Sequence, residues 1–202
     1  MLPTQAAQST PPPTILILGD SLSAEYGLQR GSGWVALLAA RLQRERMAAK
    51  VVNASISGET TSGGHTRLPA LLKQNRPQFV VIELGANDAL RGLPLRSSRD
   101  HLNAMIAASQ AQGAQVVLVG MQMPPNYGKR YGADFARMYQ DLAEAKKCAL
   151  VPFFLKGVAD RADARDWFQR DGIHPLEKAH PILLDNVWGA LQPLLLRREA
   201  RT

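Results

Sequence analysis

Short apolar runs that alternate with amphipathic stretches constrain the fold of this chain more than any other feature. The clearest runs are TILIL at 14–18, KVVNA at 50–54, FVVIEL at 79–84 and QVVLVG at 115–120. Their length and their β-branched residues are typical of buried strands. Stretches with helical character follow them at 34–46, 99–112 and 130–147. A further helical stretch follows a loop rich in Ser, Thr and Gly at 55–64 and runs to about 75, with Pro69 expected to bend or restart it. Strands that alternate with helices predict a parallel sheet with helices on both faces.

The rest of the chain completes a single domain. Residues 149–154 are expected to form a fifth strand, and Pro152 indicates a short edge strand because proline cannot donate to a ladder. Pro181 suits the first turn of a last helix that ends near 196. We therefore predict an α/β fold: a three-layer α/β/α sandwich with a mostly parallel five-stranded sheet, of the flavodoxin-like type. The domain spans 14–196, and a basic C-terminal tail follows at 197–202.

The first 13 residues stand apart from the predicted domain. They are polar and rich in Ala, Gln and Pro, and they lack the positive start and apolar centre of a complete secretory signal. We expect a flexible leader or the remnant of a signal peptide that has been removed. The second interpretation predicts a periplasmic or secreted protein, and a cytoplasmic location stays open.

The composition limits the partners. A chain of 202 residues buries a large core without help from a disulfide or a metal, and its one cysteine, Cys148, excludes an intrachain disulfide. The net charge is +7, but the basic residues are scattered, so we expect a solvated surface and no nucleic-acid partner. No apolar run reaches the ~18 residues of a membrane span, so stable membrane insertion is not expected. The sequence does not determine the oligomeric state, and we expect a monomer.

A potential nucleophile follows the first strand. Gly19-Asp20-Ser21-Leu22-Ser23 places Ser21 at the carboxyl edge of the sheet, where open α/β folds bind their ligands. A serine nucleophile needs a base, and the base needs a group that orients it. Asp171 lies three residues before His174 in the segment DGIHP, so its carboxylate can reach the near ring nitrogen. Taken alone, this segment also fits an ordinary surface turn with a local hydrogen bond.

Acyl transfer also needs hydrogen-bond donors for the developing oxyanion. Three candidates follow strand ends: the amide of Ser21, the amide of Gly58 and the side-chain amide of Asn87. Each has a simpler explanation, since Gly58 can supply a positive φ in a turn and Asn87 can cap the next element. Asp20 and Asp88 are expected to hold their loops by backbone hydrogen bonds. The combination of a nucleophile, an acid–base pair and donors favours catalysis.

These blocks together resemble the SGNH hydrolases, also called the GDSL family. The matching segments are GDSLS at 19–23, SISGETTSGG at 55–64, ELGANDALRG at 83–92 and DGIHP at 171–175. Longer stretches, such as VVNASISGETTSGG and PPNYGKRY, are similar to the bacterial thioesterase I, arylesterase and lysophospholipase group. The resemblance covers 14 to about 195. It implies Ser21 as the nucleophile, His174 as the base, Asp171 as its orienter, and Ser21, Gly58 and Asn87 as the oxyanion hole.

The resemblance also implies an activity. It predicts a serine hydrolase that cleaves carboxylic esters and thioesters through an acyl-enzyme on Ser21, with no metal and no cofactor. Aryl esters, acyl-CoA-type thioesters and lysophospholipids are the expected small-molecule substrates. Two alternatives stay open: a deacetylase of acetylated carbohydrate, and a non-catalytic binding protein on a hydrolase fold.

Apolar loop residues at the strand ends indicate where an acyl chain could bind. The candidates are Leu22, Leu90, Leu93, Met123, Pro124 and Tyr127. If these side chains line a groove, a medium-length acyl chain fits there. Ordinary packing of the loops is the alternative.

Overall fold

Five parallel strands form the centre of the molecule, which is a computed structural model that describes residues 11–200. The strands are β1 (Thr14–Gly19), β2 (Lys50–Asn53), β3 (Phe79–Glu83), β4 (Gln115–Val119) and β5 (Ala149–Val151). Their order in the sheet is β2-β1-β3-β4-β5, and every neighbouring pair is parallel. The predicted five-stranded α/β fold is confirmed, and the sheet is wholly parallel.

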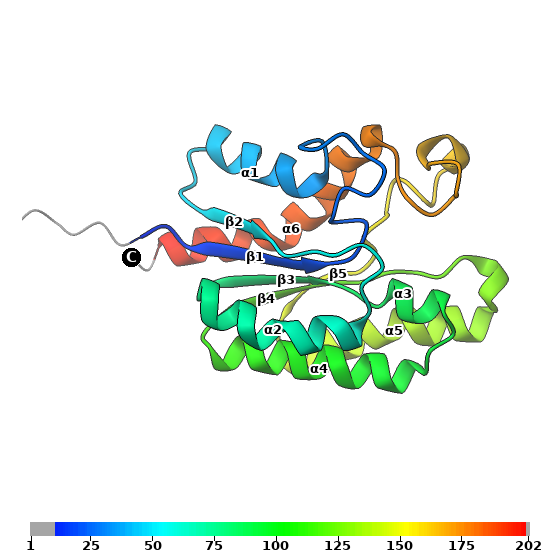
Figure 1. The fold of residues 1–202 in the computed structure, drawn as a ribbon, viewed down its shortest axis with the longest axis horizontal. Helices are drawn as coiled ribbons and strands as arrows, with labels where there is room; N and C mark the ends of the chain where they lie inside the picture. Colours follow the sequence, from blue (N-terminus) through cyan, green and yellow to red (C-terminus); the bar gives the residue numbers. More distant parts are fainter. Residues whose placement is uncertain (1–10, 201–202) are drawn as a thin grey trace, which may run out of the picture.

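Helices cover both faces of this sheet (Figure 1). One face carries α1 (Trp34–Arg44) and α6 (His180–Glu199). The other carries α2 (Thr61–Asn75), α3 (Ala86–Leu90), α4 (Leu95–Ala111) and α5 (Lys129–Lys146). Short 3₁₀ turns lie at Pro125–Tyr127, Ala164–Trp167 and Glu177–Ala179. The central strands are buried on both faces, which explains their continuous apolar sequences.

The strand order creates a switch point between β1 and β3. From β1 the chain first moves out to β2 on one side, and it then returns to β3 on the other side of β1. Open α/β sheets bind ligands outside the carboxyl ends of the strands at such a point. Because Gly19 at the end of β1 pairs with Glu83 at the end of β3, the loops that follow them begin side by side.

The sequence prediction is wrong at three helices. The short helix α3 was not predicted, α4 begins four residues earlier than expected, and α2 begins inside the predicted loop at 55–64. The start of α2 has a local cause, since the Thr60 side chain accepts a hydrogen bond from the Gly63 amide and caps the helix. Pro69 does not end α2, because the carbonyl left without a donor belongs to His65, which is exposed to solvent.

The ends of two further elements differ from the prediction. β5 is confirmed as an edge strand but stops at Val151, directly before Pro152. α6 continues to Glu199, three residues beyond the expected end of the domain. Most of the predicted leader, and the last two residues of the predicted tail, lie outside the described residues. Between residues 11 and 200, the structure contains no helix with the length and apolar character needed to cross a membrane.

Candidate active site

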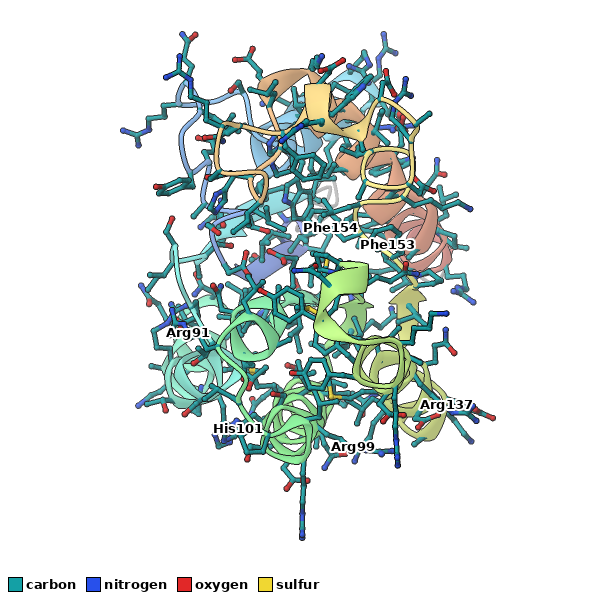
Figure 2. The ribbon with its side chains drawn as sticks, turned by 90° about the vertical axis from the view of Figure 1, so that its right-hand side faces the viewer. Arg91, Arg99, His101, Arg137, Phe153 and Phe154 are labelled. Carbon is teal, nitrogen blue, oxygen red and sulfur yellow. The ribbon has the colours of Figure 1, made fainter. Side chains whose placement is uncertain are left out.

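Ser21 lies in a tight turn directly after β1, at the carboxyl edge of the sheet. This edge of the sheet faces the viewer in Figure 2. The Ser23 amide donates to the Asp20 carbonyl at 3.2 Å, and the Leu22 amide donates to Asp20 Oδ1 at 3.0 Å. The turn requires glycine at position 19, because a Cβ there would lie 2.7 Å from Ser23 Oγ. The backbone around Ser21 is therefore held on both sides.

The late turn brings His174 and Asp171 to Ser21. His174 Nε2 lies 2.8 Å from Ser21 Oγ, and His174 Nδ1 lies 2.7 Å from Asp171 Oδ2. With the proton on Nδ1, the ring donates to the Asp171 carboxylate, and Nε2 accepts from the Ser21 hydroxyl. Nε2 is then the nitrogen that can remove the hydroxyl proton.

Hydrogen bonds from its own turn keep Asp171 ionised. Its Oδ1 accepts from the amides of Ile173 and His174, at 2.9 and 3.0 Å. Although burial raises the pKa of Asp171, the two amides and the His174 ring outweigh it and lower the pKa to about 2. The local turn that the sequence offered as an alternative therefore coexists with the contact to the histidine, and a charged Asp171 favours the proton on Nδ1.

An aromatic ring covers one side of the histidine. The Tyr26 and His174 ring centroids are 4.3 Å apart, with planes inclined by 35°. The Gln169 side chain donates to the Tyr26 carbonyl at 2.9 Å and so ties the loop after Ser21 to the late turn. Sequence analysis did not identify Tyr26, and no local pattern could have done so, because its partner lies far along the chain.

Two backbone amides at this edge are open to a ligand. Among residues 11–200, no protein group accepts from the amides of Ser21 and Gly58. Gly58 has a φ of +79°, as predicted for a glycine turn. Its loop is fixed on two sides, since the Ile56 amide donates to the Gly19 carbonyl at 3.0 Å and Arg91 Nη2 donates to the Gly58 carbonyl at 2.9 Å. Figure 2 shows Arg91 on the left of the view.

The third donor, Asn87, lies in α3 and bridges the other two. Its Nδ2 donates to Asp20 Oδ2 and to the Glu59 carbonyl, each at 3.0 Å. Asn87 is thus bonded to the residue before Ser21 and to the residue after Gly58, which brings the three predicted donors to one place. Both hydrogens of the amide have protein acceptors, so an oxyanion would share one of them.

Glycine at position 85 makes the start of α3 possible. It has a φ of +116°, and a Cβ there would collide with the hydroxyl of Tyr139. That hydroxyl is buried and donates to the Leu84 carbonyl at 3.0 Å. Gly85 therefore fixes the direction in which the chain leaves β3 and, with it, the position of Asn87.

Two buried aspartates hold the loops, as predicted. Asp20 accepts from the Leu22 amide. Asp88 accepts from the Thr61 amide at 2.9 Å and from the hydroxyls of Thr61 and Ser98, at 2.5 and 3.1 Å. Asp88 therefore joins α3 to the starts of α2 and α4.

Glu83 is a buried acid that sequence analysis missed. Its Oε2 accepts from Ser23 Oγ at 2.7 Å and from the Asp20 amide at 3.3 Å, and Ser23 Oγ accepts from Trp34 Nε1 at 3.1 Å. Burial raises the pKa of Glu83 well above its usual range and raises the pKa of Asp20 to about 6. The available signal was an acidic residue within the otherwise apolar run FVVIEL.

The six apolar loop residues predicted to bind an acyl chain differ in exposure. The Leu22 side chain is buried in the core. Leu90 and Met123 are half-buried, and Pro124 is exposed. Leu93 and Tyr127 are exposed, at 38% and 37%. Leu22 therefore packs within the fold, whereas the other five reach solvent at least in part.

The remaining histidines have partners other than Ser21. His180 is buried and accepts from the Trp34 amide at 3.1 Å, whereas His65 and His101 stack with centroids 5.5 Å apart. In the part of the chain that the structure describes, no three His, Cys, Asp or Glu side chains cluster in a way that could hold a metal ion.

Comparison with known proteins identifies the family. Residues 17–182 match the model of the GDSL-like lipase/acylhydrolase family. This chain belongs to that family. The resemblance to the GDSL family that the sequence indicated is confirmed. The prediction that the protein is an ester-hydrolysing enzyme is confirmed as well.

Individual relatives agree with this assignment. Esterase TesA of Pseudomonas aeruginosa is 50% identical over 195 residues, which cover 96% of this chain and 94% of the relative. Thioesterase 1/protease 1/lysophospholipase L1 of Escherichia coli strain K12 is 42% identical over 182 residues, 90% of this chain and 85% of the relative. The crystal structure of the psychrotrophic esterase EstA from Pseudoalteromonas sp., inhibited by monoethylphosphonate, aligns with a TM-score of 0.83 at 43% identity, over 90% of this chain and 98% of that one.

Proposed function

We propose that this chain hydrolyses carboxylic esters and thioesters through an acyl-enzyme on Ser21. The observation that carries the proposal is the continuous hydrogen-bond chain from Asp171 through His174 to Ser21, with distances of 2.7 and 2.8 Å. In this arrangement Ser21 is the nucleophile, His174 the base and Asp171 the group that orients it.

The geometry supports a two-step reaction. The substrate carbonyl binds to the amides of Ser21 and Gly58 and to the side-chain amide of Asn87. Ser21 Oγ attacks the carbonyl carbon while its proton passes to His174 Nε2, and the three donors stabilise the oxyanion. His174 then protonates the leaving alcohol or thiol. Water cleaves the acyl-enzyme by the same route, with His174 as the base.

The range of substrates is proposed from the relatives and from the open loops. One relative is named an esterase, and another a thioesterase and lysophospholipase. We infer that aryl esters, acyl-CoA-type thioesters and lysophospholipids are substrates here. The partly exposed side chains of Leu90, Leu93, Met123 and Tyr127 offer apolar contacts for an acyl chain.

A substrate panel tests the proposal. Hydrolysis of p-nitrophenyl esters from acetate to long-chain acyl groups, and of acyl-CoA thioesters, would be compared for the wild type and Ser21→Ala. We expect turnover that extends beyond acetate in the wild type and none above background in the variant. Turnover of acetyl esters alone would favour the carbohydrate deacetylase, and no turnover by a folded protein would favour the binding protein.

Location and oligomeric state remain predictions from the sequence. We infer a periplasmic or secreted protein, for which the polar, proline-rich residues 1–13 are the support, and a monomer. Cell fractionation and light scattering of the purified protein test the two statements. Recovery in the cytoplasmic fraction, or a mass twice that of the chain, would contradict them.

A further inference from the structure

A pair of buried carboxyl groups lies next to the oxyanion donors. Gly19 and Glu83 are partners in the register of β1 and β3, so the sheet itself places the Glu83 side chain beside the residue that precedes Ser21. Asp20 and Glu83 are 1% and 2% exposed, Glu83 Oε2 accepts from the Asp20 amide at 3.3 Å, and burial and then the charge of Asp20 raise the pKa of Glu83. Two ionised carboxylates do not share a site without water, so one of them keeps a proton.

The hydrogen-bond partners show which carboxyl group holds the charge. Asp20 accepts from the Leu22 amide at Oδ1 and from the Asn87 amide at Oδ2, so both of its oxygens face donors. Glu83 accepts at Oε2 from Ser23 Oγ and the Asp20 amide. Among residues 11–200, no positively charged side chain contacts the carboxyl group of Asp20 or of Glu83. Both donors to Glu83 bond Oε2, so its Oε1 is left to carry a proton. Burial raises the pKa of Glu83 well above its usual range, in agreement with this assignment.

We propose that Glu83 is a neutral carboxylic acid that donates a hydrogen bond to Asp20 and thereby positions Asn87 for the oxyanion. Neither Glu83 nor Asp20 touches the reacting atoms, so both are positioning residues. The catalytic consequence rests on the proposed function, whereas the protonation of Glu83 does not.

The proton that Glu83 keeps has a second effect, on the hydrogen bonds of Asn87. Both hydrogens of the Asn87 amide are bonded in the free enzyme, to Asp20 and to the Glu59 carbonyl. A donor from Glu83 draws on the charge of Asp20, so Asp20 holds the amide less tightly and Asn87 can share a hydrogen with the oxyanion. Ionisation of Glu83 would instead place a second negative charge beside the developing oxyanion and oppose the reaction.

Two substitutions separate a neutral acid from a carboxylate at position 83. Glu83→Gln keeps one acceptor and supplies an amide donor toward Asp20, so kcat should stay within about threefold of wild type. Glu83→Leu removes both, so kcat should fall by roughly tenfold or more, with KM little changed, because Asn87 acts mainly on the transition state. Ser109→Ala is the control for the loss of a buried hydrogen bond that does not involve Asp20 or Asn87, because Ser109 donates to the Met105 carbonyl within α4.

The pH profile adds a readout that a purely structural role would not move. The other ionisable groups beside this pair are His174, which acts on Asp20, and Tyr139, whose pKa is raised by burial and then by the charges of Glu83, Asp88 and Asp20. Wild-type kcat should fall at alkaline pH as Glu83 ionises, and Glu83→Gln should lack this limb because it has no proton to lose. Identical alkaline limbs in the two proteins would overturn the proposal, as would Glu83→Gln as inactive as Glu83→Leu.

Infrared spectroscopy tests the protonation state without reference to activity. At pH 7 the wild type should show the C=O stretch of a protonated carboxylic acid, shifted by ¹³C-glutamate labelling and absent from Glu83→Gln. A wild type without this band would overturn the proposal even if Glu83→Leu fails to fold. A protein that shows the band but hydrolyses no ester would instead contradict the proposed function and leave Glu83 neutral, so the two failures are distinguishable.

Discussion

Replacement of Gly85 by alanine should be the most damaging small change near the site. At φ +116° a non-glycine residue costs about 1–3 kcal/mol. The new Cβ also meets the Tyr139 hydroxyl, which is buried and bonded to the Leu84 carbonyl, so the ring cannot move without loss of that bond. Such overpacking typically adds about 1–3 kcal/mol. The sum, about 2–6 kcal/mol, is a large part of the ~5–15 kcal/mol that stabilises a typical domain.

Urea denaturation and ester hydrolysis measure the two consequences. The matched control is Gly92→Ala, where φ is +67° and no heavy atom lies within 4 Å of the new Cβ, so only the backbone cost of about 1–2 kcal/mol remains. In a Tyr139→Phe background, Gly85→Ala should cost less, because the colliding hydroxyl is gone. Activity should fall with stability, since Gly85 sets the position of Asn87. The reasoning is refuted if Gly85→Ala and Gly92→Ala lower the unfolding free energy equally.

Four further predictions concern the site. Asn87→Ala should lower kcat about 10²–10³-fold with little change in KM, and an unchanged kcat would exclude it from the oxyanion hole. Asp171→Asn should lower kcat about 10⁴-fold by allowing the wrong tautomer. Because its pKa is about 2 in the folded protein against 3.8 normally, Asp171 stabilises the fold above about pH 4 and loses this effect as the pH falls toward 2. Urea titrations of the wild type and Asp171→Asn should therefore converge in acid, and a constant gap would contradict this. Tyr26→Ala should lower kcat about two- to fivefold through loss of a cation–π contact with the protonated His174, whereas Tyr26→Phe should not; equal losses would exclude the contact.

The sequence was most informative where function depends on local pattern. The apolar runs identified every strand. The signal was clearest for β1, β3 and β4, because strands buried on both faces have few polar positions. Asp171 and His174 could be paired because they lie three residues apart in one turn, and their contact is confirmed. Ser21, Gly58 and Asn87 could be named because each follows a strand end, and strand ends of a parallel sheet meet at one edge.

The contacts that sequence analysis missed depend on distant parts of the chain. Glu83 lies beside Asp20 only because β3 pairs with β1, and nothing in the run FVVIEL shows that register. The Tyr26 ring reaches His174 only when the loop after β1 meets the late turn. The helix α3 has five residues and follows a glycine with positive φ, so neither periodicity nor a side-chain cap predicts it. Both contacts and the short helix therefore depend on how distant parts of the chain pack together.

Covalent labelling of Ser21 tests the central claim most directly. The wild type, Ser21→Ala and Ser109→Ala would be treated with a fluorophosphonate, and the modified residue located by peptide mass spectrometry. We predict one adduct, on Ser21, in the wild type and in Ser109→Ala, and no adduct in Ser21→Ala. An adduct that persists in Ser21→Ala, or that maps to another residue of the wild type, would contradict Ser21 as the nucleophile.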